Sequence, residues 1–339
     1  MKKIHVGIIG LGYIGKIHLK NCLKLKSAKI IAAADISKKA LNYARELGIK
    51  RLFTDYHELL KQPDIDAVLI SLPTHLHTEC TISAAEEGKH VFLEKPLASK
   101  LEEGKKIISA VKKHDVKLMV GYPLRFSRKF IDIKKQMESG ALGDIQAAHA
   151  VNIAAGPFMH RAETMTPLPV PEWWFNKNLT GGGALIDLGS HMINLTRWYF
   201  GAVRRIKSYL GYRFNFDFED QAICIAQFES GTTAVIDVGW FSQKPKVSIE
   251  LYGTVGHAYG DHKSRGKIIT AVQLILGMTP TFFIPYLNEV SYFIDCIKND
   301  CQPSPNGEDA LEDLKVITDA YSNQIFFEVS SNALCPDDN

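Results

Sequence analysis

The sequence predicts an α/β protein in which a doubly wound parallel sheet is followed by a second domain built on a mostly antiparallel sheet. Strand-like apolar runs alternate with amphipathic helical runs from residue 4 to residue 122, which is typical of a parallel sheet. A glycine motif directly follows the first of these strands. After residue 203, strand-like runs follow one another with turn signals and no helices between them, which favours antiparallel pairing.

The first strand and its glycines have the form of a dinucleotide-binding turn. The run "IHVGIIGLGYIG" places Gly10, Gly12 and Gly15 at G-x-G-x-x-G spacing between a strand and a helix. In this motif the first glycine permits a tight turn, the second lets the backbone approach a pyrophosphate, and the third brings the helix against the strand. Tyr13 and Ile14 open that helix, whose free N–H groups would face the phosphates.

The end of the second strand bears on the choice of cofactor. The run "AKIIAAAD" ends at Asp35, twenty residues after Gly15. A carboxylate at this place accepts hydrogen bonds from the adenosine ribose and would repel the 2′-phosphate of NADP, so NAD is the expected cofactor. Lys38 and Lys39 follow closely and soften that discrimination, so NADP stays open as the alternative.

Three further strands complete the first domain. The run "IDAVLIS" ends at Ser71, "KHVFLE" at Glu94 and "VKLMVGY" at Tyr122. Doubly wound sheets bind ligands at the carboxyl ends of their strands. Glu94 and Lys95 end a strand immediately before Pro96, so we expect both charges to face a cofactor rather than the core.

The second domain carries a signature of its own. We expect residues 1–122 to form the nucleotide-binding domain and residues 123–339 a substrate-binding and oligomerisation domain, whose final helices can pack back toward the first. Within it, "GGGALIDLGSHMINL" has helical periodicity and places Asp187 and His191 four residues apart on one helical face. A carboxylate beside an imidazole can raise its basicity and fix its tautomer. A solvated ion pair is the plainer interpretation, but the triple glycine permits close approach of a ligand or of the other domain.

Composition excludes several classes of partner. The chain has a net charge of +3, 46% hydrophobic residues and 23% charged residues, as in an ordinary globular protein. Basic residues are scattered, so neither nucleic acid nor membrane is an expected partner. The sequence shows neither an export signal nor a long apolar span, and its six cysteines form no Cys-x-x-Cys pair. We therefore expect a cytoplasmic protein with free thiols.

The segment "HLHTEC" contains residue types that bind zinc. His75, His77 and Cys80 do not have the spacing of a usual zinc cluster, however. A cofactor contact or a helix start is the favoured interpretation, and no metal site is expected.

Three stretches together resemble the Gfo/Idh/MocA family, the glucose–fructose oxidoreductase and inositol dehydrogenase group. They are "GLGYIG" with Asp35, "EKPLA" with Lys95, and "GGGALIDLGSHMINL" with Asp187 and His191. The ending, with "YLNEVSYFIDCIKND" and "EDALEDLKVITDAY", is also similar to that of the family, so the resemblance spans nearly the whole chain. It implies an NAD(P)-dependent dehydrogenase that transfers a hydride from a secondary hydroxyl of a sugar, sugar derivative or cyclic polyol.

The resemblance also implies roles for individual residues. Lys95 would contact substrate and nicotinamide, His191 would act as general base, and Asp187 would bind substrate and assist the histidine. The loop after the fourth strand and the glutamate of "EKP" would hold the cofactor, together with the lysine that follows. The residues at these positions are Ser71, Pro73, Thr74, His77, Glu94 and Lys95.

Four more residues are candidate substrate contacts. Tyr122 and Arg125 in "GYPLRF" lie at the expected domain junction, where joining the domains is an equal alternative. Trp174 is suited to stacking on a sugar ring or to packing in the core. Asn194 stands where many family members carry aspartate, three residues after the histidine, which bears on hydrogen bonding near the site.

Two other functions stay open from the sequence, and one assembly is expected. The alternatives are a catalytically silent, cofactor-binding regulator and an NAD-dependent glycosidase of the same fold. Retention of both Lys95 and His191 argues against the regulator. The strands "QAICIAQF" and "TTAVIDVGWF" carry apolar residues on both faces, which predicts that the second sheet forms the interface of a homodimer or homotetramer.

Overall fold

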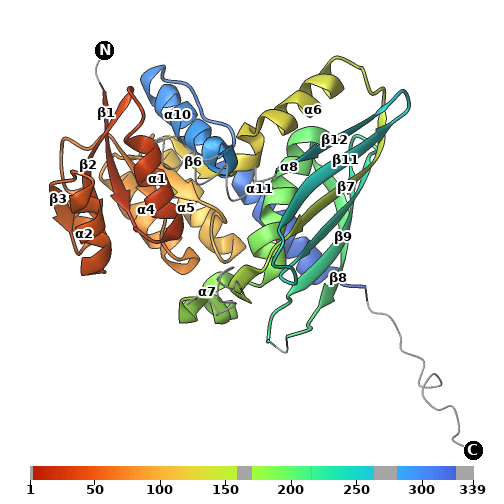
Figure 1. Cartoon of the computed structure of the whole chain (residues 1–339), viewed down its shortest axis with the longest axis horizontal. Helices are drawn as coiled ribbons and strands as arrows, with labels where there is room; N and C mark the ends of the chain where they lie inside the picture. The colour runs from red at the N-terminus through yellow and green to blue at the C-terminus, as the bar shows by residue number, and fades with distance from the viewer. Residues whose placement is uncertain (1–2, 159–169, 215, 263–280, 326–339) are drawn as a thin grey trace, which may run out of the picture.

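The protein is built on two sheets, one from each half of the chain (Figure 1). The computed structural model describes residues 3–158, 170–214, 216–262 and 281–325. The predicted fold class, a parallel Rossmann sheet followed by a domain with a mostly antiparallel sheet, is confirmed. The predicted domain boundary at residues 122–123 lies between the last strand of the first sheet and the short helix η2 (Pro123–Phe126).

The first sheet is doubly wound, and all its strands are parallel. Its order is β3-β2-β1-β4-β5-β6, so the direction of winding reverses between β1 and β4. The carboxyl ends of these two strands are the place where such sheets bind ligands. The strands are β1 (Ile4–Ile9), β2 (Ala28–Ala34), β3 (Arg51–Phe53), β4 (Ala67–Ile70), β5 (His90–Glu94) and β6 (Leu118–Gly121).

Helices cover both faces of the first sheet. They are α1 (Tyr13–Cys22), α2 (Lys38–Glu46), α3 (Tyr56–Leu60), the short η1 (Thr74–Leu76), α4 (His77–Glu86) and α5 (Leu101–Lys113). A helix from the end of the chain, α10 (Ile284–Lys298), lies beside α1 (Figure 1). Its buried Val290, Phe293 and Ile294 join the apolar core of the first domain. The last part of the chain therefore packs back onto the nucleotide-binding half.

The second sheet has the order β12-β11-β7-β10-β9-β8, and β7 and β10 form its parallel pair. Along β9, Ala222, Cys224 and Ala226 are buried, whereas Ile225 points to the opposite face and is 48% exposed. Among the described residues, helices thus cover one face and leave the other open. The strands are β7 (Ile145–Ile153), β8 (Val203–Gly211), β9 (Gln221–Phe228), β10 (Thr233–Gly239), β11 (Lys246–Gly253) and β12 (His257–Asp261).

One helix links the cores of the two halves. The helix α11 (Gly307–Ser322) packs on α5 of the first domain and on α8 (Ser190–Phe200) of the second. Its buried Ala310, Leu314 and Ile317 belong to a single apolar cluster that runs through both halves. The remaining helical segments are α6 (Arg128–Glu138), η3 (Gly156–Phe158), η4 (Glu172–Phe175), α7 (Lys177–Thr180), η5 (Leu185–Gly189) and η6 (Thr281–Phe283).

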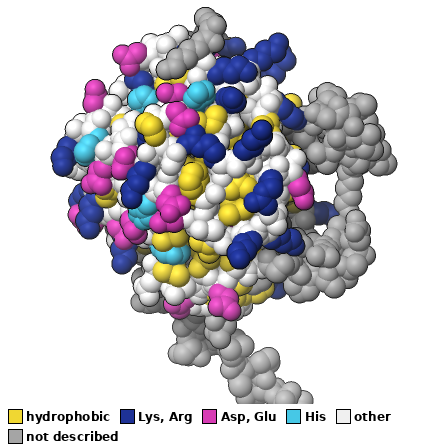
Figure 2. Space-filling model, turned by 90° about the vertical axis from the view of Figure 1, so that its left-hand side faces the viewer, with side chains coloured by type: hydrophobic (Ala, Val, Ile, Leu, Met, Phe, Trp, Pro, Cys, Tyr) yellow, Lys and Arg dark blue, Asp and Glu magenta, His cyan; other side chains and the backbone are white. Residues whose placement is uncertain are grey.

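The surface of the first domain carries charges of both signs. Figure 2 views the molecule from that side and shows Lys and Arg side chains interspersed with Asp and Glu. Neither sign dominates the described part of this face, in keeping with the small net charge of +3. In the described ranges no helix is both long and apolar enough to cross a bilayer. Five cysteines in those ranges are free thiols, and Cys335 lies outside them.

Candidate active site

The glycine turn between β1 and α1 has the form that a bound dinucleotide requires. A Cβ on Gly10 would lie 2.5 Å from the Ser71 carbonyl oxygen, and one on Gly15 would lie 2.0 Å from the Gly10 carbonyl oxygen. These two glycines are therefore required by the fold itself. A Cβ on Gly12 would meet no described residue within 4 Å, which leaves room for a ligand to approach the backbone there.

The surroundings of the turn also suit a cofactor. Gly12 gives the N-terminus of α1 no side-chain cap, which leaves its first N–H groups for an anion. Tyr13 and Ile14 form the first turn, and Tyr13 is 70% exposed. The Ser71 hydroxyl at the end of β4 is buried and has no hydrogen-bond partner in the described part of the chain. These residues fit NAD.

Asp35 ends β2 beside the glycine turn, as predicted. One carboxylate oxygen accepts from the Leu11 N–H at 2.6 Å and the other from the Ser37 N–H at 2.7 Å. The carboxylate therefore braces the glycine turn in addition to offering its remaining lone pairs to a ribose. Sequence reasoning had anticipated only the second of these roles.

The structure brings Lys95 and Asp187 together from the two halves of the chain. Lys95 Nζ donates to Asp187 Oδ1 at 2.6 Å and to the Asp187 carbonyl at 2.9 Å. Trp240 Nε1 donates to the other carboxylate oxygen at 3.1 Å. Burial alone would raise the pKa of Asp187, but Lys95, followed by His191 and Trp240, outweighs it and lowers that pKa. Asp187 is therefore a carboxylate that holds the Lys95 ammonium in place.

The expected hydrogen bond between Asp187 and His191 does not form. His191 Nδ1 has no hydrogen-bond partner within the described residues, because Lys95 and Trp240 occupy the carboxylate. The charge of Asp187 does raise the pKa of His191, as expected, but larger effects outweigh it. Burial, followed by the charge of Lys95, lowers the pKa of His191 to about 3, although Asp187 opposes the shift. At neutral pH the imidazole is therefore uncharged, and it binds a proton less readily than a free imidazole does.

Local backbone structure explains how Asp187 reaches Lys95. The predicted continuous helix begins instead as a π-helical turn, η5, that contains Asp187 and passes into α8 at Ser190. Such turns are frequent at functional sites, because the extra residue per turn redirects a side chain. His191 lies in the first turn of α8 and packs edge-on against the Tyr122 ring at 6.1 Å. Tyr122 thus reaches the site, through His191.

The triple glycine before η5 is required by protein neighbours rather than by a ligand. A Cβ on Gly183 would lie 1.8 Å from the Glu219 carbonyl oxygen, and one on Gly181 would lie 2.5 Å from the Ser99 carbonyl oxygen. Glu219 Oε1 also accepts from the N–H groups of Gly183 and Leu185 at 3.0 and 2.8 Å, and from the Tyr321 hydroxyl at 2.8 Å. Glu219, which the sequence gave no reason to select, anchors the start of the segment that carries Asp187.

Three predicted cofactor contacts lie in the loop after β4, and one of them is placed differently from the expectation. Pro73 and Thr74 begin η1, with Thr74 buried. His77 is 1% exposed, and its two ring nitrogens lie 2.9 Å from the carbonyl oxygens of Leu72 and Pro96. Burial lowers the pKa of His77, so the neutral ring donates its one N–H to one of these two carbonyls and braces the loop; a contact with a cofactor stays a prediction. The same contacts keep it from forming a zinc cluster with Cys80.

Arg125 and Asn194 belong to a buried network instead of the expected substrate surface. Arg125 Nε donates to Asn194 Oδ1 at 2.8 Å, and Asn194 Nδ2 donates to Asp313 Oδ2 at 2.6 Å. Arg197 forms an ion pair with the other Asp313 oxygen. Both ends of the Asn194 amide are thus engaged, and the network joins η2, α8 and α11. Arg125 had two interpretations, a substrate contact and a residue that joins the two domains, and the geometry supports the second.

Trp174 lies beside the site in an aromatic cluster. Its ring is 6.2 Å from that of Trp240, whose N–H binds Asp187, and 5.7 Å from that of Trp173. Trp174 is partly buried against this cluster. It is therefore both a packing residue and a side chain at the edge of the site, and stacking on a substrate stays a prediction.

Glu94 faces a buried histidine. Its Oε1 lies 2.6 Å from Nε2 of His18 on α1, and the two residues are 8% and 0% exposed. The carboxyl group of Glu289 on α10 lies within 4.8 Å of both. Glu94 Oε1 is therefore engaged by His18, and Lys95 of the pair reaches Asp187; a contact between Glu94 and the cofactor stays a prediction.

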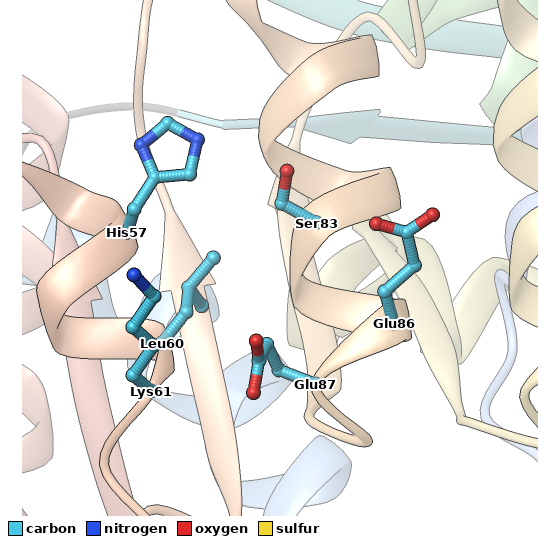
Figure 3. A pocket seen from close by; sticks show the side chains of 6 residues that line it. All are labelled: His57, Leu60, Lys61, Ser83, Glu86 and Glu87. Atoms are coloured by element: carbon cyan, nitrogen blue, oxygen red, sulfur yellow. The ribbon is translucent and has the colours of Figure 1, made fainter.

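A surface hollow of about 120 Å³ lies away from these residues (Figure 3). It opens between α3 and the C-terminal end of α4, whereas the site lies at the carboxyl ends of the strands. Its lining side chains are His57, Leu60, Lys61, Ser83, Glu86 and Glu87.

The fold, the glycine turn and the Lys95–Asp187 pair define an NAD(P)-dependent oxidoreductase. Residues 4–122 match the model of the oxidoreductase family with an NAD-binding Rossmann fold, and residues 130–259 match the GFO/IDH/MocA C-terminal domain. The chain belongs to the GFO/IDH/MocA oxidoreductase family, and the predicted family, enzyme class and NAD cofactor are confirmed.

Known relatives cover nearly the whole chain. Myo-inositol 2-dehydrogenase of Thermotoga maritima is 30% identical over 328 residues, which cover 90% of this chain and 92% of the relative. scyllo-Inositol 2-dehydrogenase (NAD(+)) of Bacillus subtilis is 29% identical over 329 residues, covering 93% and 92%. The structure of scyllo-inositol dehydrogenase from Lactobacillus casei with NAD(H) and scyllo-inositol is 26% identical, with a TM-score of 0.80 and coverage of 95% and 97%.

Proposed function

We propose that this protein oxidises a secondary hydroxyl of a cyclic polyol of the inositol type, or of a ring sugar, with NAD as the hydride acceptor, and catalyses the reverse reaction. The observation that carries the proposal is the Lys95–Asp187 pair beside a neutral His191. The names of the relatives, which act on myo- and scyllo-inositol, support the substrate class.

The three side chains divide the chemistry between them. The hydroxyl O–H and the carbinol C–H both break while the C=O bond forms, and NAD, when bound, takes the hydride. His191 accepts the hydroxyl proton as general base. The Lys95 ammonium stabilises the negative charge that develops on the substrate oxygen. Asp187 fixes the position of Lys95 through its carboxylate and its carbonyl.

The test combines a substrate panel with two variants. Purified protein with NAD is expected to form NADH with at least one inositol or ring sugar. Lys95→Ala should lower kcat by about 10²–10³ and His191→Ala by about 10²–10⁴, while both retain NAD affinity and melting temperature. Lys117→Ala is the matched control, because it removes an ion pair of 2.8 Å with Asp300, outside the site.

The outcomes separate this proposal from the other functions of the same fold. Glycoside hydrolysis without net NADH would indicate a glycosidase, and NAD binding without turnover of any substrate would indicate a regulator. Loss of melting temperature with normal activity in Lys95→Ala would assign the lysine a structural role and contradict the proposal.

Assembly through the second sheet is the accompanying proposal. Tyr209, Ile225, Tyr252 and Tyr259 lie on its open face and are 39%, 48%, 45% and 53% exposed. Ile225 pairs in register with Val235 of β10, which places two aliphatic side chains next to each other there. A second copy of the chain that covered this face would bury these side chains, so a homodimer or homotetramer is expected.

A further inference from the structure

The residues on both sides of Lys95 are held by buried histidines. Before it, the Glu94 side chain is bound by His18 Nε2 at 2.6 Å. After it, the Pro96 carbonyl lies 2.9 Å from His77 Nδ1. His18 is 0% exposed and His77 is 1% exposed, so solvent does not compete for either contact.

Each histidine connects Lys95 to a different part of the expected cofactor site. His18 lies on α1, the helix that begins at the glycine turn, and its ring packs edge-on against Phe92 of β5 at 5.2 Å. His77 begins α4, and its second nitrogen lies 2.9 Å from the carbonyl oxygen of Leu72 in the loop after β4. His18 thereby connects the residue before Lys95 to the helix of the glycine turn, and the His77 ring lies between the carbonyl of the residue after Lys95 and that of Leu72, with its one N–H donated to one of the two.

A third buried side chain, Glu289, lies close to His18 and Glu94. Glu289 on α10 is 0% exposed, and neither of its carboxyl oxygens has a hydrogen-bond partner among the described residues. Burial, followed by the charge of Glu94, raises the pKa of Glu289 well above its usual value. Glu289 therefore keeps a proton more readily than an exposed glutamate, and His18 Nε2 remains the side-chain group in contact with Glu94 Oε1, at 2.6 Å.

We propose that His18 and His77 are positioning residues that set the place of the Lys95 ammonium during hydride transfer. This inference rests on the proposed function. The ammonium reaches Asp187 across the two halves of the chain, and its side chain is 16% exposed, so its position depends on where the backbone of its own turn is held. A displacement of about 1 Å from a reacting atom can cost about 10² in rate.

The test compares two substitutions of similar size at one position. His18→Gln keeps an amide N–H near the place of Nε2 and can still bind Glu94, whereas His18→Asn is too short to do so. We expect His18→Asn to lower kcat by about 10–10², with NAD affinity and KM within about twofold, and His18→Gln to restore most of the activity. His77→Leu should behave like His18→Asn. His90→Asn is the matched control, because His90 lies on the same strand at its far end and accepts from the Lys117 N–H at 3.1 Å.

A double substitution distinguishes positioning from a loss of stability alone. If His18 acts through Lys95, then His18→Asn should lower kcat no further in a Lys95→Ala background, because groups that act as a unit are not additive. Equal losses in the two backgrounds, or a folded His18→Asn with the wild-type kcat, would overturn the inference. Full activity of the single variant Lys95→Ala would instead contradict the proposed function. That result needs no histidine variant, so the two failures can be told apart.

Discussion

Acidification should destabilise the folded protein through His191. Burial, followed by the charge of Lys95, lowers the pKa of this histidine to about 3, although Asp187 opposes the shift. In an unfolded chain a histidine titrates near a pKa of about 6.5. Between these values the unfolded chain binds a proton that the folded protein does not, so the free energy of unfolding falls as the pH is lowered. This stability is complete above about pH 6.5 and is lost progressively toward pH 3.

The size of the effect follows from those two pKa values. At about pH 5 the unfolded chain has taken up most of its proton at this position and the folded protein almost none. The difference amounts to about 2 kcal/mol in the free energy of unfolding. That is large enough to measure against the usual total of about 5–15 kcal/mol for a folded domain.

The assay is urea unfolding of the wild type and of His191→Gln at several values between about pH 5 and pH 7.5. Other buried histidines titrate in both proteins, so the difference between the two free energies of unfolding isolates His191. Relative to the variant, the wild type should lose about 2 kcal/mol on going to about pH 5. His257→Gln, at an exposed position on β12, should preserve the wild-type slope. If the free energy of unfolding depended on pH in the same way in the wild type and in His191→Gln, the reasoning would be refuted.

Three further outcomes are expected. Asp35→Ser should raise the Kd of NAD and shift the preference toward NADP, because the carboxylate that would repel a 2′-phosphate is gone. A wild type that already prefers NADP in binding assays would contradict this prediction. Glu219→Ala leaves two buried N–H groups and a hydroxyl without their acceptor and should lower the free energy of unfolding by about 3 kcal/mol or more, whereas the control Tyr321→Phe should cost about 1 kcal/mol. Ile225→Asp should dissociate the assembly, which light scattering would detect as a lower molar mass. A wild type that is a monomer at micromolar concentration would refute assembly through the open sheet face.

The first domain could be predicted in detail because its signals are local. A strand, a glycine turn and a helix follow one another within about twenty residues of β1, and Gly10 and Gly15 each have a distinct steric reason. The place of Asp35 follows from the length of one βαβ unit. The end of β5 was also recognisable, since Pro96 cannot continue a strand.

The partners of the charged residues could not be predicted, because they come from distant parts of the chain. His18 and Glu94 are 76 residues apart, and Asp187 is 53 residues from Trp240. Nothing in local spacing selects such pairs. Glu94 was therefore expected to meet the cofactor, although the buried His18 and Glu289 lie on its side of the strand.

The pairing of Asp187 shows why spacing along a helix is a weak guide at such a site. Spacing of four residues favoured His191 as its partner, yet the carboxylate binds Lys95, which is 92 residues away in the sequence. A half-buried carboxylate gains more from a permanent cation than from an imidazole whose charged form burial disfavours. Once Lys95 holds Asp187, its charge also opposes protonation of His191. The ion pair across the two halves therefore fixes the ammonium, while burial, followed by the charge of Lys95, keeps the imidazole uncharged.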